Sequence, residues 1–114
     1  MTSIRKIILI NLLLATSTIT TNAFAACSSG ACIGKIDQLY VNASGVLIQT
    51  DGNELSLNCT AVSNVFITLR LDHPNYNAIY SGLLAAQYGA KDVRIRITEG
   101  SNDCRVAYIS TDSQ

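Results

Sequence analysis

Apolar and polar residues alternate in several short segments of the chain, a pattern typical of half-buried β-strands. The alternation is regular in residues 54–58, 65–71 and 92–98, where apolar or β-branched side chains fall at every second position. Less regular apolar segments flanked by turn residues also predict strands, at residues 33–41, 46–50 and 105–110. The Asp51-Gly52-Asn53 turn predicts a hairpin between the second and third strands.

One segment changes from the period of a strand to that of a helix. Its apolar side chains recur three or four residues apart, at Tyr76, Ile79, Tyr80, Leu83 and Leu84. Residues 72–75 carry capping and first-turn residues before this segment, and Gly89 occupies a C-cap position after it. The chain therefore has the predicted order β-β-β-β-α-β-β, a mainly β protein with one helix.

This order predicts a small, disulfide-bonded, OB-fold-like barrel. A small sheet exposes its edge strands unless it closes. Strands with a single late helix match the five-stranded OB barrel, in which the helix plugs one end. In that arrangement one of the four leading strands is a long meander split at residues 51–53, and the first strand pairs antiparallel with the strand after the helix.

The N-terminal segment has the three parts of a secretory signal peptide. Arg5 and Lys6 precede an apolar run at residues 7–15, and Ala23-Phe24-Ala25 is a small-x-small end. The apolar run is too short to span a membrane, which takes roughly 20 residues. We expect a signal peptide at residues 1–25 and a single OB-like domain at 26–114, in the periplasm or secreted. A lipoprotein cleaved before Cys27 is the alternative.

Composition and charge narrow the possible functions. Hydrophobic residues make up 48% of the 114 residues, far more than in a disordered chain. Residues 26–114 contain six basic and eight acidic side chains, a net charge of −2. Such a domain has no basic patch for nucleic acid.

Four cysteines remain after the predicted cleavage, at Cys27, Cys32, Cys59 and Cys104. An even number in an exported chain predicts two disulfides, in one of three connectivities. The OB arrangement places Cys32 near Cys104, which would leave Cys27 for Cys59. No close pair of metal ligands is present, so neither a metal nor another cofactor is predicted.

The candidate chemistry favours binding over catalysis. His73 is the only histidine and the carboxylates fall in or near turns, so no catalytic group is predicted and the chain is not expected to be an enzyme. Amide and hydroxyl side chains in loops are good sugar ligands. The candidate ligand-binding residues are Asn42, Ser44, Asn75 and Asn77. Arg94 and Arg96 share one strand face and are candidates for a subunit interface.

Three segments occur in a characteristic order: Gly34-Lys35-Ile36-Asp37, Leu83-Leu84-Ala85-Ala86 and residues 89–97. The combination, over about residues 34–97, resembles the OB-fold B subunits of the subtilase cytotoxin and typhoid toxin group of AB5 toxins. The resemblance implies a pentameric ring that binds cell-surface glycans, with a secreted catalytic A subunit as partner. In that group, a serine central to sialic-acid binding precedes the first strand. Here that stretch lies in the predicted signal peptide, and the family's C-terminal cysteine pair is missing.

The sequence thus predicts a secreted, non-enzymatic binding module that resembles a toxin B subunit and binds carbohydrate as a homo-oligomer. The alternative is a periplasmic protein that binds or inhibits another protein through a sheet edge or its loops. Neither hypothesis requires nucleic acid or a membrane span.

Overall fold

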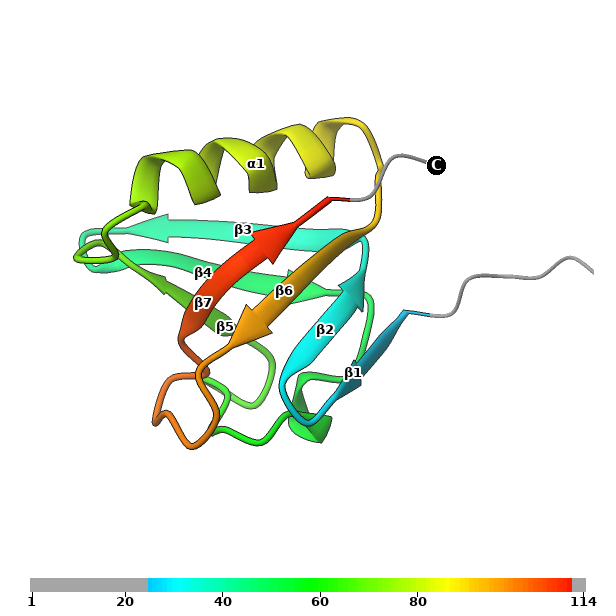
Figure 1. The fold of residues 1–114 in the computed structure, drawn as a ribbon, viewed down its shortest axis with the longest axis vertical. Coiled ribbons are helices and arrows are strands. Elements are labelled where there is room, and N and C mark those ends of the chain that lie inside the picture. The colour runs from blue at the N-terminus through cyan, green and yellow to red at the C-terminus, as the bar shows by residue number, and fades with distance from the viewer. Residues whose placement is uncertain (1–24, 112–114) are drawn as a thin grey trace, which may run out of the picture.

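The computed structural model describes residues 25–111, so the predicted signal peptide lies outside the described residues except for Ala25. The described chain forms two β-sheets and one α-helix (Figure 1). Its elements are β1 (Ala26–Ser28), β2 (Ala31–Gly34), β3 (Ile36–Asn42), β4 (Gly45–Thr50), the short 3-10 helix η1 (Glu54–Ser56), β5 (Ile67–Arg70), α1 (Tyr76–Tyr88), β6 (Val93–Ile97) and β7 (Val106–Ser110).

The two sheets share one long extended segment. The order of one sheet is β1-β2-β6-β7 and that of the other is β3-β4-β5, and all neighbouring strands are antiparallel. Only Lys35 separates β2 from β3, so this segment pairs in one sheet and then in the other. A second connection joins β5 to the residues just before β7. There, Thr68 and Arg105 form a single parallel bridge, and the Thr68 backbone N–H donates to the Cys104 carbonyl at 3.1 Å.

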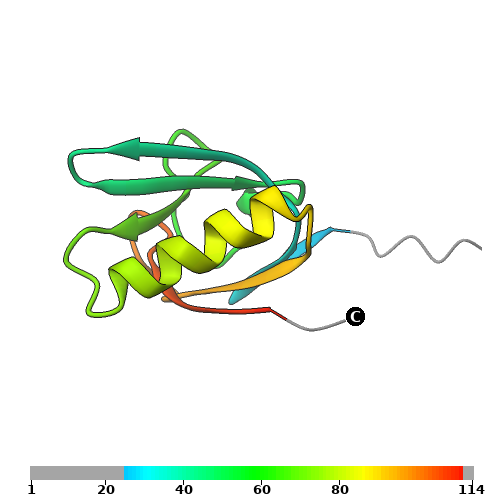
Figure 2. The same cartoon turned by 90° about the horizontal axis from the view of Figure 1, so that it is seen from above.

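The hydrophobic core lies between the two sheets and under α1. Side chains with no exposed surface come from both sheets and from the helix, and include Val46, Ile48, Ile67, Leu69, Leu83 and Ile95. The helix lies across one end of the sheets (Figures 1 and 2). A Cβ atom added at Gly82 would lie 2.7 Å from the Ile109 Cδ1 atom, so a small residue lets α1 approach β7 closely.

Several sequence predictions are confirmed. The protein is mainly β with one helix, and α1 ends at Tyr88 with Gly89 as its C-cap. The first predicted strand pairs antiparallel with the strand after the helix, as β2 and β6. The predicted closed barrel is not observed, because the strands between residues 25 and 111 divide into two sheets joined on one side by an isolated bridge.

Two local predictions are wrong. Residues 54–58 do not form a strand, because their first three residues form η1, where the Asn53 side chain accepts a hydrogen bond from the Leu55 N–H at 3.1 Å. This cap and the buried Glu54 side chain override the alternation of the sequence. The segment at residues 26–32, where no strand was predicted, forms β1 and the start of β2, which pair as a hairpin.

The predicted disulfide pairing is also wrong, although all four cysteines are bonded. The disulfides are Cys27–Cys32 and Cys59–Cys104, not Cys32–Cys104 and Cys27–Cys59. Cys27 and Cys32 lie directly opposite each other in the β1–β2 hairpin. The loop after β6 folds back toward the segment at residues 58–60, where the Gly100 N–H donates to the Asn58 carbonyl at 2.7 Å.

The longer disulfide is expected to contribute more to stability than the shorter one. Cys59–Cys104 spans a sequence separation of 45, against 5 for Cys27–Cys32. Because the chain-entropy effect grows with loop length, Cys59→Ser/Cys104→Ser should cost about 4 kcal/mol and Cys27→Ser/Cys32→Ser about 2 kcal/mol. Denaturant unfolding of the two oxidised variants measures this difference, and an equal loss in both would contradict it.

A buried carboxylate fixes the turn after β4. Glu54 is 4% exposed and Thr50 is 2% exposed. The Glu54 Oε1 atom accepts hydrogen bonds from the Thr50 hydroxyl at 2.8 Å and from the Thr50 backbone N–H at 2.6 Å. The Thr50 hydroxyl also accepts a hydrogen bond from the Gly52 N–H at 3.2 Å. The side chains of Glu54 and Thr50 together therefore fix the backbone of this turn.

Glu54→Ala should lower the free energy of unfolding by about 1–3 kcal/mol, because two buried donors lose their acceptor. Glu54→Gln keeps a carbonyl acceptor and should lose less. The control is Glu99→Ala, whose exposed ion pair with Arg96 at 3.6 Å should contribute under about 1 kcal/mol. Urea unfolding with the disulfides intact measures all three, and a control loss equal to that of Glu54→Ala would refute the role of the buried carboxylate.

Candidate binding site

The turn between β3 and β4 and the loop between β5 and α1 meet at one end of the molecule (Figures 1 and 2). The Leu71 backbone N–H donates to the Ser44 carbonyl at 3.1 Å and ties the two segments together. Gly45 has a φ of +141°, and a Cβ atom there would collide with the Leu69 carbonyl oxygen. A glycine at this position therefore allows the turn to lie against the end of β5.

The β3–β4 turn presents two of the predicted ligand-binding residues. The Asn42 Oδ1 atom accepts a hydrogen bond from the Ser44 backbone N–H at 2.8 Å, which is the geometry of an Asx turn. Both residues are exposed. The amide nitrogen of Asn42 and the hydroxyl of Ser44 form no hydrogen bond to another described residue, so both remain available to a ligand.

His73 fastens the other loop to the four-stranded sheet. Its Nδ1 atom accepts a hydrogen bond from the Asn75 N–H at 3.0 Å, and its Nε2 atom lies 2.9 Å from the Ala107 carbonyl oxygen. An accepting Nδ1 and a carbonyl at Nε2 together require the neutral tautomer with the proton on Nε2. Because backbone groups occupy both ring nitrogens, His73 positions the loop before α1.

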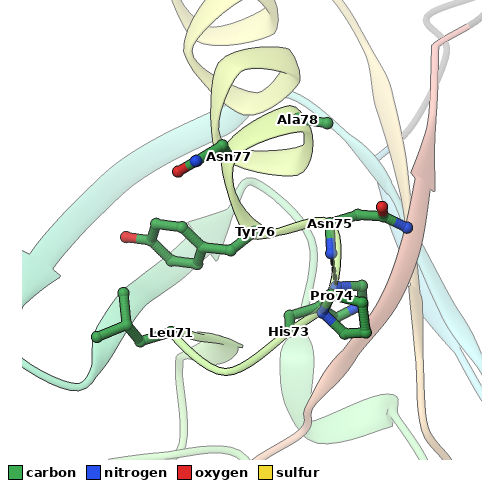
Figure 3. Close-up of a pocket in the computed structure, with 7 residues that line it drawn as sticks. All are labelled: Leu71, His73, Pro74, Asn75, Tyr76, Asn77 and Ala78. Atoms are coloured by element: carbon green, nitrogen blue, oxygen red, sulfur yellow. Dashed lines mark hydrogen bonds between the residues drawn. The ribbon is translucent and has the colours of Figure 1, made fainter.

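A shallow hollow of about 540 Å³ lies at this loop–helix junction. Its lining residues are Leu71, His73, Pro74, Asn75, Tyr76, Asn77 and Ala78. In Figure 3, the side chains of Leu71, Tyr76 and Asn77 lie on one side of the junction. The side chain of Asn75 points to the other side. The structure therefore separates Asn75 from Asn77, both of which were predicted to bind a ligand.

Exposed apolar side chains also occur at this end of the molecule. Leu71 is 57% exposed, and Tyr40 and Val41 are exposed just before the β3–β4 turn. The Tyr76 and Tyr80 rings stack with a centroid separation of 6.1 Å, which holds the Tyr76 ring in place. The site thus combines exposed apolar surface with amide and hydroxyl groups, and this combination suits a ligand with both C–H and O–H groups.

Leu71 was not predicted as a site residue. The alternating segment at residues 65–71 places it on the same face as Ile67 and Leu69, both of which are fully buried. Strand β5 ends at Arg70, so Leu71 leaves the core. Asp72-His73-Pro74 immediately after it is the only sequence signal for this early end.

The predicted interface arginines lie on the outer face of β6, as the alternation indicated. Arg94 is exposed, whereas Arg96 is partly buried and pairs with Glu99. A Cβ atom added at Gly30 would collide with the Arg96 guanidinium group, which therefore lies against the backbone at this glycine. The two arginines thus differ, since only Arg94 is free of a local ion pair among the described residues.

Two further observations concern residues 25–111 only. No cluster of three or more histidine, cysteine or carboxylate side chains in this range could hold a metal ion. None of the helices there has the length and hydrophobicity needed to cross a membrane.

Comparison of the chain with protein-family models, curated proteins and solved structures gives no match.

Removing the His73 ring should loosen the loop before α1. His73→Ala deletes both hydrogen bonds, and we expect a loss of about 1–2 kcal/mol and faster exchange of the Asn75 amide proton. The matched control is Asp72→Ala, which removes an exposed ion pair with Arg70 at 3.2 Å and should cost less than about 1 kcal/mol. Hydrogen exchange and urea unfolding measure both effects. Unchanged exchange at Asn75 would contradict the positioning role.

Proposed function

We propose that this protein is a secreted, non-enzymatic binding module that recognises carbohydrate with the end formed by the β3–β4 turn and the start of α1. The observation that carries this proposal is the Leu71–Ser44 hydrogen bond. It joins two segments, distant in sequence, that each supply predicted sugar ligands. Asn42 and Ser44 lie in the turn that this hydrogen bond joins to Leu71, and the Asn77 side chain lies on the same side of the loop–helix junction as that of Leu71 (Figure 3).

The chemistry of this end suits a sugar. Amides and hydroxyls exchange hydrogen bonds with sugar hydroxyls, while the exposed apolar side chains offer surface to the C–H groups of a ring. A hollow of about 540 Å³ is within the size range of small-molecule sites, roughly 300–1,000 Å³. It is open and shallow, so a single site would bind weakly.

Repetition in a ring would compensate for weak single sites, because linked sites raise the effective concentration of ligand. The continuous β2–β3 segment and the parallel Thr68–Arg105 bridge support an OB-like arrangement of the two sheets. With the resemblance to toxin B subunits, they support a pentamer with a secreted catalytic subunit as partner. Two disulfides and the predicted signal peptide support export.

The test is binding of the purified oxidised protein to an array of cell-surface glycans, followed by titration of the best ligand. Asn77→Ala should weaken binding about 3- to 10-fold, since one lost hydrogen bond contributes about 0.5–1.5 kcal/mol. Asn42→Ala should have a similar effect. Asn102→Ala, in the exposed loop after β6, is the control and should leave binding unchanged.

Size-exclusion chromatography of the same sample tests the ring. Absence of glycan binding, together with a monomer that co-purifies with one exported protein, would replace this proposal with a protein-interaction or inhibitor function. Equal losses in Asn77→Ala and Asn102→Ala would place the glycan site elsewhere.

A further inference from the structure

Two of the basic side chains form no ion pair with another described residue. Four of the six basic residues between 25 and 111 have a carboxylate within 4 Å, in the pairs Lys35–Asp92, Arg70–Asp72, Arg96–Glu99 and Arg105–Asp103. Within that range, Lys91 and Arg94 are exposed and have no such partner.

Lys91 and Arg94 line the same groove. It has a volume of about 710 Å³ and lies between the second half of α1 and the neighbouring parts of β2, β6 and β7. This is the end of α1 opposite the proposed carbohydrate site, on the right in Figure 1. Along α1 the hollow reaches Ala78 and the groove begins at Gly82, so about 6 Å of helix lies between their nearest edges, at a rise of about 1.5 Å per residue.

Small apolar residues line the helix side of the groove, and the rest of its lining includes the Lys35–Asp92 ion pair at 3.2 Å, Ser110 and Thr111. The helix contributes Gly82 and Ala85, the following turn contributes Ala90, and Ile33 of β2 is 39% exposed. None of the three helix and turn residues has a side chain long enough to fill the space. On the sheet side, the groove reaches Ser110 at the end of β7, which is an edge strand.

We propose that this groove binds an acidic polypeptide segment that carries apolar side chains. Carboxylates of the segment would pair with Lys91 and Arg94, and its apolar side chains would cover Ile33 and the small residues of α1. An extended segment can also lie beside the edge strand β7, where main-chain hydrogen bonds are available. A sulfated polysaccharide would meet the two cations but would leave the apolar wall without a partner.

The experiment uses fluorescence anisotropy with the purified oxidised protein and a short labelled peptide of alternating glutamate and valine. Its comparison ligands are a peptide of glutamate alone, a peptide of alternating lysine and valine, and dextran sulfate. We expect the glutamate–valine peptide to bind most tightly. Added salt should weaken this binding, because salt screens exposed charges.

Variants separate charge from shape. Lys91→Gln/Arg94→Gln should weaken peptide binding at least about 10-fold. Asn64→Asp/Asn102→Asp changes the net charge by the same amount at exposed positions in two other loops and should have no effect. Ala85→Gln narrows the groove without changing charge and should also weaken binding. Ser81→Gln, an exposed position on the same helix outside the groove, is its control.

Three results would overturn the proposal: equal losses in the two charge variants, equal losses in Ala85→Gln and Ser81→Gln, or binding of dextran sulfate as tight as that of the glutamate–valine peptide. Urea unfolding of each variant verifies that it is folded. Asn77→Ala should leave peptide binding unchanged, so failure at the groove and failure at the carbohydrate site give different patterns.

Discussion

The Cys59–Cys104 disulfide is the constraint on which the arrangement of the two sheets depends. It joins the segment between η1 and β5 to the loop before β7, and beside it the Thr68 N–H donates a hydrogen bond to the Cys104 carbonyl. Without this connection, β5 and β7 are edge strands of separate sheets. A chain of this size buries a small core, so a covalent link across the sheets substitutes for the closure that a longer sheet would provide.

At the other end of the core, α1 packs on both sheets. Ile79, Leu83 and Ala86 are buried on it, and Gly82 allows it to approach Ile109 of β7. Because the disulfide holds one end and the helix covers the other, the loops at the two ends of α1 are held on a packed core. Both proposed binding surfaces therefore lie on supported backbone, which reduces the entropy lost when a ligand orders them.

Local patterns predicted the fold where a single face of an element is buried. The periodicity at residues 76–88 and the alternation at 93–97 depend only on which side meets the core, and both elements formed as predicted. The strand predicted at 54–58 failed because buried Glu54 satisfies the backbone of Thr50, an interaction that alternation does not encode. The disulfide pairing failed because it depends on loop paths, and sequence spacing leaves three connectivities open.

The candidate sites show the same division between local and long-range information. Amides in turns could be identified one residue at a time, but the Leu71–Ser44 contact that joins the turn to the loop depends on the register of β4 and β5. Arg94 was predicted on an exposed strand face, whereas its position beside Lys91 and the small residues of α1 required the packing of helix on sheet. Exposed ion pairs add little stability. An unpaired cation is therefore informative only together with the shape of the surface around it. At this groove, Lys91 and Arg94 border a depression whose helix side consists of small apolar residues.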